Sequence, residues 1–476
     1  MQQLLTTVFL IVYSLTVAGV VLVIITDNRN PLKTLPWMLV LVFAPGVGLL
    51  IYFFFGQNLS KRKIIPRRTR KRIDGWLEKE HAADPSAVPA RWQPLARLLE
   101  QTAHALPLSG SRIVSYIDGQ SKMEALLAAI AEAEHHIHIQ YYILCDDDAG
   151  RQLRDALIAK ARQGVRVRIL YDDVGCARVK KRFFEEMRAE GIEVFAFLHV
   201  QFPRFTSKVN YRNHRKIAVI DGRIGFIGGM NIADRYIRGI DRGAGRREPW
   251  RDTHFRVDGP GVAGLQASFL SDWSATTKKR IEDPAFFPPA ERLSDGILQT
   301  VSSGPFGQWR TLLQADSFAV ARAARRVWIQ TPYYLPSETL DAALQEAALA
   351  GIDVRLMLPE RSDSRVVDLA GHSYLDKMMQ AGVKIAFYTP GFLHSKLLII
   401  DDDLTVIGSA NMDFRSFEHN FEVSAFVYDS DFCGRMAVLF EHDAESCRPL
   451  TPAEWFRRPR TRRWAESFMR IFAPLL

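Results

Sequence analysis

Two stretches of this chain repeat the same polar residues at the same spacing. Both read His-x-Lys-x4-Asp, and both continue to a glycine and an asparagine at matched distances. A single His-x-Lys pair is common in ordinary strands, whereas five matched positions that occur twice indicate a duplicated functional site. The matched residues are His214, Lys216, Asp221, Gly228 and Asn231 in the first stretch, and His394, Lys396, Asp401, Gly408 and Asn411 in the second.

These residue types suit chemistry on a phosphate group. Lysine supplies positive charge, asparagine supplies N–H donors, and histidine can attack or transfer protons. Together they can hold the negative charge of a phosphate while one of its bonds is displaced. Two copies supply two histidines, and so one nucleophile and one general acid.

Each copy is predicted to form a β-hairpin. Residues 214–220 are rich in β-branched side chains, and the histidine and lysine, at i and i+2 on a strand, face the same way. A turn at Asp221-Gly222 then brings Asn231 back opposite His214. The second copy is predicted to close in the same way around Asp402-Asp403.

Around the motifs, predicted strands and helices alternate in the same order in both halves of the chain. Alternation of this kind is typical of α/β folds. We therefore predict two α/β domains, at residues 106–290 and 291–476, related by a pseudo-twofold axis and meeting at the two motifs.

The N-terminal residues 1–60 are predicted to form a transmembrane helical hairpin. Leu4–Ile25 is a run of 22 residues without a charge, enough to span a bilayer. The alternative is a cleaved signal peptide, but a basic n-region and a small-residue cleavage site are absent. A second uncharged run covers Leu35–Phe55, with Pro45 and Gly48 placed to kink it.

Residues 61–105 are predicted to form a basic juxtamembrane segment followed by a linker. Lys61–Arg72 carries eight Lys/Arg, which places the rest of the chain on the cytoplasmic side by the positive-inside rule. The basic run either sits against anionic headgroups or is only a topology signal. Residues 82–94 are rich in Ala and Pro, which favours a linker. The net charge of +9 fits an anionic partner: a nucleic acid, a membrane or a substrate.

The C-terminal end is basic and aromatic. Trp464, Phe468, Phe472 and Leu475 recur near helical spacing beside several arginines. This pattern fits an interfacial amphipathic helix and, equally, a helix packed on the domain.

Two insertions and four cysteines complete the pattern. About ten extra residues within 199–213 and about ten within 233–250 extend the first half on either side of its motif, either as surface loops or as a basic, aromatic rim. The cysteines have no CxxC or metal-binding spacing, which indicates unpaired thiols or core residues.

The duplicated motif resembles that of the phospholipase D superfamily, and the whole chain resembles bacterial cardiolipin synthases with two transmembrane helices. The resemblance also rests on Trp250–Thr253, on Asn420–Glu422 and on a Pro45-x2-Gly48-x3-Tyr52-x3-Gly56 pattern. It implies transfer of a phosphatidyl group from one phosphatidylglycerol to another through a phosphatidyl-histidine. The products would be cardiolipin and glycerol, made at the bacterial inner membrane without a metal or other cofactor.

The resemblance also implies roles for the site residues. It makes His214 the nucleophile and His394 the acid/base. Asp221 and Asp401 belong to the motif that names the family, although their place at hairpin turns favours a structural role. The remaining expected catalytic residues are Lys216 and Lys396; the expected phosphate-binding or supporting residues are Asn231, Asn411, Asp252, Glu422, Ser409 and Ser416, with the carboxylates Asp252 and Glu422 orienting the histidines.

Other functions remain open at this point. One is a phospholipase D, or a phosphatidyltransferase with another donor or alcohol. Another is a membrane-anchored nuclease of the same superfamily, which the charge fits although motifs for base stacking are absent and no nucleic acid is expected. A non-catalytic scaffold for anionic lipid is disfavoured because both motifs are intact. The sequence does not indicate an oligomeric state.

Overall fold

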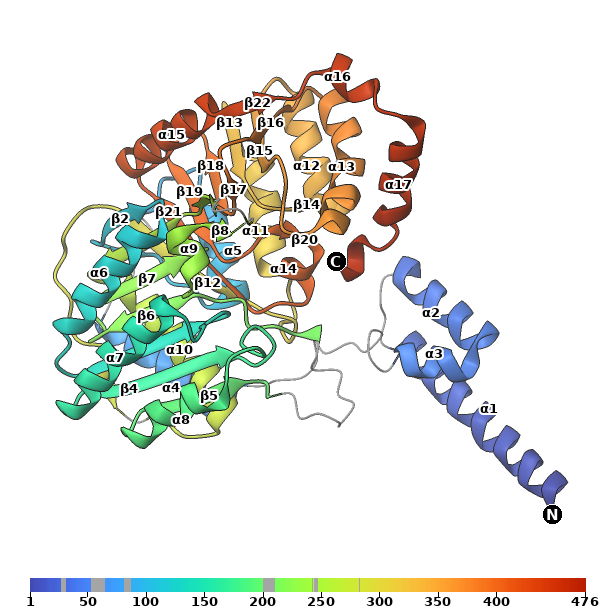
Figure 1. Cartoon of the computed structure of the whole chain (residues 1–476), viewed down its shortest axis with the longest axis horizontal. Helices are drawn as coiled ribbons and strands as arrows, with labels where there is room; N and C mark the ends of the chain where they lie inside the picture. Colours follow the sequence, from blue (N-terminus) through green and yellow to red (C-terminus); the bar gives the residue numbers. More distant parts are fainter. Residues whose placement is uncertain are drawn as a thin grey trace. The chain divides into compact units, whose positions relative to one another are not determined.

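The computed structural model describes residues 1–26, 31–52, 65–80, 87–199, 210–241, 243, 247–281 and 283–476 (Figure 1). The chain forms two compact units. One is Met1–Arg62 with Val200–Tyr211, and the other is Lys63–His199 with Arg212–Leu476. We call the second the catalytic body, because it carries both motifs in which catalytic residues are expected.

The described residues of the N-terminal unit form one long apolar helix and two short ones. Helix α1 (Gln2–Thr26) is the one helix in the described residues that is long and apolar enough to cross a membrane. The second apolar run forms α2 (Pro31–Phe43) and α3 (Pro45–Ile51), so the predicted kink at Pro45 is a break between two helices. Proline lacks an N–H and disfavours a helical conformation in the residue before it. The second run is therefore not one continuous span, and residues 53–60 of the predicted hairpin lie outside the described part.

The catalytic body contains two mixed sheets with the same internal strand order, which confirms the predicted pair of α/β units. In each, three parallel strands are followed by an antiparallel hairpin and a further antiparallel strand. The first sheet runs β2 (Arg112–Tyr116), β11 (His254–Asp258), β7 (Ile224–Gly228), β6 (Ile217–Ile220), β3 (His136–Tyr141), β4 (Arg166–Asp172) and β5 (Glu193–Phe197). The second runs β1 (Leu108–Ser109), β12 (Ile297–Ser303), β21 (Glu422–Tyr428), β19 (Leu404–Gly408), β18 (Leu397–Ile400), β13 (Arg326–Gln330), β15 (Asp353–Pro359), β16 (Lys384–Tyr388) and β22 (Cys447–Pro449).

Helices pack on both faces of the two sheets. The outer face of the first sheet carries α6 (Gly119–Ala131), α7 (Asp148–Arg162) and α8 (Lys181–Ala189), and that of the second carries α11 (Thr311–Val320), α12 (Glu338–Leu349) and α13 (Arg365–Gln380). Helices α16 (Pro452–Phe456) and α17 (Arg460–Arg470) pack against α13. Helices α10 (Val262–Thr277) and α15 (Ser430–Glu445) lie on the inner faces, in a core that contains motif strands of both sheets.

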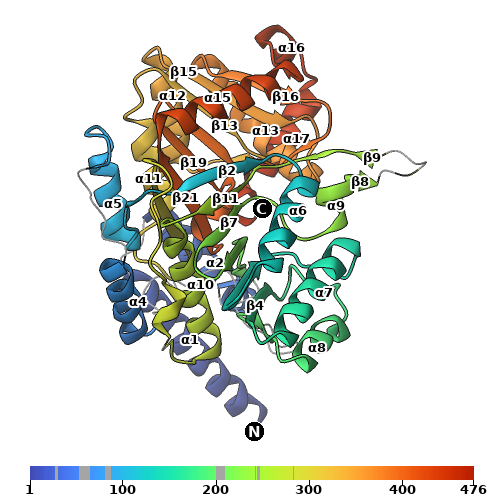
Figure 2. The ribbon, with the colours of Figure 1, turned by 90° about the vertical axis from the view of Figure 1, so that its left-hand side faces the viewer.

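The two motif hairpins form the contact between the sheets. Strands β6 and β7 pair antiparallel with Ile220 opposite Ile224, and β18 and β19 pair in the same way, so both predicted hairpins are confirmed. Their side chains alternate between two cores. Ala218 packs in the core of the first α/β domain, whereas Ile217 and Val219 pack in the core that the two domains share. Burial on both faces explains why these strands are apolar at every position. Figure 2 shows β7 and β11 beside β19 and β21 in the middle of the body.

The motif glycines allow close approach of the next strand. A Cβ on Gly228 would lie 2.5 Å from the Cα of His254, and one on Gly408 would lie 2.2 Å from the carbonyl oxygen of Val423. Any larger side chain would push β11 or β21 away from the hairpin, so the strand that follows each motif could not pair.

Part of the predicted linker is instead core. Helix α4 (Arg67–Glu80) packs against α10, and α5 (Gln93–Ala103) buries Leu95 and Leu99 in the second unit. Trp92 is fully buried and donates its Nε1–H to Asp403 at 2.9 Å. The Ala/Pro-rich composition around residue 90 obscured an amphipathic helix whose buried residues Leu95, Ala96 and Leu99 are spaced i, i+1 and i+4. Strand β1 likewise joins the second sheet, although the predicted domain boundary assigned it to the first α/β domain.

Candidate active site

Backbone pairing between the halves holds both motif histidines. The two-residue strand β10 (Trp250–Arg251) runs parallel to β17 (Phe392–Leu393), and the His394 amide donates to the Arg251 carbonyl at 2.7 Å. In the first motif, the His214 amide donates to the Phe421 carbonyl at 2.9 Å. Each histidine is therefore fixed to a segment of the opposite half.

Those segments carry the two buried carboxylates, so the histidines and carboxylates are paired across the halves. His214 Nδ1 lies 3.0 and 3.1 Å from the two carboxylate oxygens of Glu422. His394 Nδ1 lies 2.6 Å from Asp252 Oδ2. The sequence predicted that these carboxylates orient the histidines, but it did not predict that each half orients the histidine of the other.

This pairing fixes which ring nitrogen is available for chemistry. A carboxylate accepts the Nδ1 proton of a neutral imidazole, which leaves the lone pair on Nε2. Neither Nε2 has a hydrogen-bond partner within the described part of the chain. The side chains are 12% exposed for His214 and 8% for His394, so each nitrogen faces a nearly closed space.

The lysines lie beside the histidines and carry unusually low pKa values. Lys216 Nζ donates to the His214 carbonyl, and Lys396 Nζ to the His394 carbonyl, each at 2.5 Å. Burial lowers the pKa of Lys216 to about 7 and that of Lys396 to about 8, while Asp252 and Glu422 oppose the shift. The protonation state of each lysine should therefore respond to the charge of a group that binds beside it.

The histidines are neutral and the carboxylates charged near pH 7. Burial lowers the pKa of His214, and burial with the nearby Lys396 ammonium lowers that of His394 to about 3. Burial would raise the pKa of Asp252, but Lys396 and His394 outweigh it and lower that pKa. Glu422 is buried too, and His214 and Lys216 lower its pKa in the same way. Each histidine also feels the lysine of the other half, so the two motifs form one electrostatic site.

The asparagines follow the hairpins back toward the histidines but are engaged locally. Asn231 accepts from the Ile143 amide at 3.1 Å and donates to the Tyr236 hydroxyl. Asn411 donates to Asp413 at 3.1 Å, and its Oδ1 is buried without a partner. Their predicted role as phosphate ligands stays a prediction.

The two serines support other site residues. Ser409 is fully buried, and its hydroxyl donates to Glu422 and accepts from the Val423 amide at 3.0 Å. Ser416 is also fully buried, and its hydroxyl accepts from the Asn411 amide at 3.0 Å. These contacts fit the supporting role among the two expected from the sequence, and a direct contact of either hydroxyl with phosphate stays a prediction.

Asp221 and Asp401 lie at the far ends of the motif strands and are not brought together with the histidines. Asp221 has φ 53° and accepts from the amides of residues 134, 135 and 136, each at 2.8 Å. Asp401 has φ 51° and accepts from the amides of residues 324, 325 and 326. Each carboxylate therefore ties its hairpin turn to the start of the neighbouring strand, as their position at turns predicted.

Comparison with known proteins places this site in a family. The family model described as "Cardiolipin synthase, PLD-like domain" matches residues 126–241 and 319–444, and "Phospholipase_D-nuclease N-terminal" matches residues 14–57. The chain is 39% identical to a cardiolipin synthase of Alkalihalophilus pseudofirmus over 98% of this chain and 93% of that protein. It is 35% identical to the major cardiolipin synthase of Bacillus subtilis over 98% of both chains. The chain belongs to the cardiolipin synthase family of phospholipase D-like proteins.

A solved structure supports the fold. The phosphatidylserine synthase of Haemophilus influenzae superposes with a TM-score of 0.59 at 13% identity, covering 80% of this chain and 98% of that one. At that identity, the similarity concerns the fold alone.

A second set of matched residues lies beneath the site. The spacing of the two motifs did not predict it. Gln140 donates to Asp272 at 2.6 Å in the first half, and Gln330 donates to Asp443 at 2.8 Å in the second. Arg251 binds Asp443 through two nitrogens at 2.7 and 3.1 Å and so anchors the strand that carries Asp252. The signal was the recurrence of Ile-Gln at the end of the first parallel strand of each half.

Aromatic rings pack beside both motif histidines, and the sequence did not predict these contacts. The Tyr142 ring centroid lies 4.9 Å from that of His214, and the Trp250 centroid lies 5.0 Å from that of His394. Such apolar walls contribute to the burial that keeps both imidazoles neutral.

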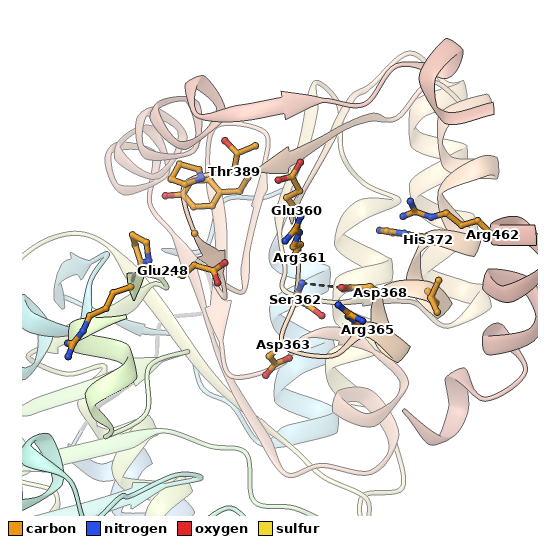
Figure 3. Close-up of a pocket in the computed structure, with 16 residues that line it drawn as sticks. Glu248, Glu360, Arg361, Ser362, Asp363, Arg365, Asp368, His372, Thr389 and Arg462 are labelled. Atoms are coloured by element: carbon orange, nitrogen blue, oxygen red, sulfur yellow. Dashed lines mark hydrogen bonds between the residues drawn. The ribbon is translucent and has the colours of Figure 1, made fainter. Parts of the chain in front are cut away.

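The second half contains a hollow of about 1200 Å³, with Glu248 and Thr389 on one side and His372 of α13 and Arg462 of α17 on the other (Figure 3). Pro249 and Gly391 also line it, and they directly precede β10 and β17, the strands that lead to Asp252 and His394. Of the two insertions, residues 200–209, 242 and 244–246 lie outside the described residues; Arg247 and Glu248 line this hollow.

Proposed function

We propose that this chain is a cardiolipin synthase that transfers a phosphatidyl group from one phosphatidylglycerol to a second. The observation that carries the proposal is the pair of neutral histidines, one from each half, with Nε2 free and Nδ1 held by a carboxylate of the other half. One nitrogen can attack phosphorus while the other handles the proton of the leaving or entering alcohol. Nearly full-length similarity to cardiolipin synthases supports this substrate class.

In the first step, His214 Nε2 attacks the phosphorus of phosphatidylglycerol. The bond between phosphorus and the glycerol headgroup oxygen breaks, and the Nε2–H of protonated His394 supplies the proton that releases glycerol. An anionic phosphate beside His394 favours the protonated form of the His394 ring. Substrate binding therefore produces the general acid, although the ring is neutral in the free enzyme. Glu422 balances the positive charge that the imidazole of phosphatidyl-His214 acquires, and Lys216 and Lys396 stabilise the charge on the phosphate oxygens.

In the second step, neutral His394 takes the proton from the terminal hydroxyl of a second phosphatidylglycerol. The oxygen attacks phosphorus, the phosphorus–nitrogen bond breaks, and cardiolipin leaves with His214 restored. No step needs a redox partner, because every bond change is a displacement at phosphorus. The order of the two histidines follows the family resemblance.

The setting we propose is the bacterial cytoplasmic membrane. Helix α1 anchors the chain, and α2 and α3 complete a membrane domain with the catalytic body on the cytoplasmic side, in line with the basic run after residue 60. Anchoring would keep the site beside both lipid substrates, which diffuse in two dimensions.

The test uses the full chain purified in vesicles of phosphatidylglycerol with EDTA present, beside His214→Ala and His394→Ala. The expected result is cardiolipin plus glycerol from the unsubstituted enzyme, and activity at least roughly 10³-fold lower from each variant. Phosphatidic acid as the main product would make the protein a hydrolase. Absence of any lipid product, with other donors and alcohols also supplied, would favour the nuclease or scaffold.

A trapping experiment assigns the nucleophile. After acid-free quenching of a reaction with labelled phosphatidylglycerol, peptide mapping should find the phosphoryl label on the peptide that contains His214. Label on the peptide that contains His394, and none on His214, would reverse the two roles while leaving the transfer reaction intact.

A further inference from the structure

Helix α17 packs on the catalytic body through its charged face. Glu466 is 2% exposed and pairs with Arg458 Nη2 at 3.3 Å and Arg462 Nε at 3.2 Å. Arg458 also pairs with Asp376 of α13 at 3.1 Å, and the Arg470 guanidinium lies 4.3 Å from the Tyr374 ring centroid. Ion pairs and a cation–π contact therefore hold the inner face of this helix.

The apolar side chains of α17 point the other way. Trp464 is 79% exposed, Phe468 59% and Ile471 70%. Their spacing of i, i+4 and i+7 puts them in one stripe, on the side of the helix opposite Glu466. A surface helix ordinarily buries its apolar stripe and exposes its charges, so the amphipathicity of α17 is inverted. The stripe continues into Leu475, which is 55% exposed.

Positive charge surrounds this apolar stripe. Between Arg457 and the C-terminal Leu476 there are six arginines and a single acidic residue, Glu466, which is buried and already paired. Arg457 and Arg460 are exposed, and Arg463, also exposed, pairs with Asp376 of α13 at 3.8 Å. The outer surface of α17 therefore combines large apolar side chains with an excess of positive charge, and its complement is an apolar phase bordered by anions.

We propose that α17 docks on an anionic lipid bilayer and inserts Trp464, Phe468 and Ile471 at the boundary between headgroups and acyl chains. A basic helix with a Trp/Phe stripe suits this depth, where tryptophan is favoured. A stripe of three side chains is too narrow for a stable contact with a second copy, which needs roughly 800 Å² from each partner. The chain also carries α1, an apolar helix long enough to cross a membrane, which would hold the protein at a bilayer.

Docking at α17 has a consequence for substrate access, and this step rests on the proposed function. Arg462 of α17 lines the hollow that Pro249 and Gly391 also line, and these two residues directly precede β10 and β17, which lead to Asp252 and His394. With α17 in the headgroup layer, the side of the hollow that Arg462 lines lies near the depth of a phospholipid headgroup. A lipid could then approach the second half of the site without leaving the bilayer interface.

The direct test places a photoreactive benzophenone amino acid at position 468 of the full chain in vesicles of phosphatidylglycerol and phosphatidylethanolamine. Irradiation should give adducts whose mass gain equals one phospholipid. The control position is Val438 on α15, which is 71% exposed and lies among charged neighbours; it should give at least roughly tenfold fewer lipid adducts. Crosslinks from position 468 to residues 1–62 or to a second chain, in place of lipid adducts, would overturn the proposal, as would equal lipid adducts at both positions. This readout needs no catalysis, so it stands apart from the proposed reaction.

An activity test uses Trp464→Ser combined with Phe468→Ser and Ile471→Ser. All three side chains are exposed, so the melting temperature in detergent should stay within about 2 °C. Turnover of phosphatidylglycerol dispersed in detergent should stay within twofold, whereas the apparent KM on vesicles should rise roughly three- to tenfold with kcat preserved. An unchanged KM on vesicles would contradict a docking role for the helix.

Discussion

At the scale of residues, the pairing of each histidine with a carboxylate of the other half decides what the site can do. The motif spacing predicted that His214 and Lys216 share a face, because strand geometry sets that relation locally. It could not predict the exchange of Asp252 and Glu422, since the exchange depends on a pair of two-residue strands and an isolated β-bridge, which carry no periodic signal. The sequence left open whether Ser409 and Ser416 bind phosphate or support other site residues, because a hydroxyl in a motif does not reveal whether it faces substrate or a buried partner.

Gly229→Ala should damage catalysis through Asp252. A Cβ on Gly229 would lie 2.1 Å from Asp252 Oδ1, so the carboxylate that orients His394 must move. A displacement of about 1 Å near the chemistry can cost about 10²-fold, and we expect that loss in kcat for cardiolipin formation. The control is Gly434→Ala in the middle of α15, where an added Cβ meets nothing within 4 Å; it should leave kcat unchanged and stabilise slightly. Normal kcat for Gly229→Ala would show that the Asp252 position is not critical.

Glu422→Gln should act on His214 although the two residues belong to different halves. The amide keeps the shape but removes the negative charge that offsets the cationic phosphatidyl-histidine, so we expect roughly 10²- to 10⁴-fold slower formation of the labelled intermediate. Rapid-quench measurement of the labelled enzyme checks this. Unaltered labelling in Glu422→Gln, with loss only in Asp252→Asn, would argue that His394 is the nucleophile.

At the scale of elements, the hairpins were predictable and the helices around them less so. Runs such as Leu397–Ile400 are apolar and β-branched, and the turn residues that follow mark where they end. Helix α5 was not predicted, because its three apolar side chains make sense only against a core formed by residues far along the chain. The same limit applied to α17, whose stripe was visible in the sequence but whose outward direction depends on ion pairs to α13.

Asp221→Ala should reduce stability rather than chemistry. The substitution leaves three backbone N–H groups at the start of β3 without their acceptor, at a cost of roughly 2–4 kcal/mol in the free energy of unfolding. Urea unfolding in detergent measures the loss, and kcat per folded molecule should stay within about threefold. Asp221→Asn keeps an oxygen acceptor and should lose less. Full stability with abolished activity would instead assign Asp221 to the reaction.

At the scale of the whole molecule, burial of many histidines makes the fold sensitive to acid. Burial lowers the pKa of His136 and of His372 to about 4, and that of His394 to about 3. His138 and His254 are lowered in the same direction. The pair of α/β domains was predictable from the repeated alternation of elements. This acid sensitivity was not, because it arises only when residues far along the chain, such as Phe286 beside His136 and Trp455 beside His372, pack against the rings.

Stability should therefore fall as the pH drops below about 6.5. The unfolded chain binds a proton on each histidine near pH 6.5, whereas the folded chain resists protonation until about pH 4, so the unfolded state is favoured within that window. His136 alone should cost on the order of 3 kcal/mol by pH 4. Melting temperatures measured from pH 8 to pH 4 test this, and His372→Gln should make the decline shallower. A melting temperature that stays constant down to pH 5 would refute the expectation.

The exchange of carboxylates between the halves also bears on how such a chain could have arisen. Neither half contains both a motif histidine and the carboxylate paired with it, so under the proposed mechanism a lone half would be inactive as a monomer. Two copies of one ancestral half, associated as a symmetric pair, would already complete both histidine–carboxylate pairs. Duplication and fusion of that gene would then preserve a working site at every stage, and afterwards one carboxylate could become Asp and the other Glu without either copy being free to lose its partner.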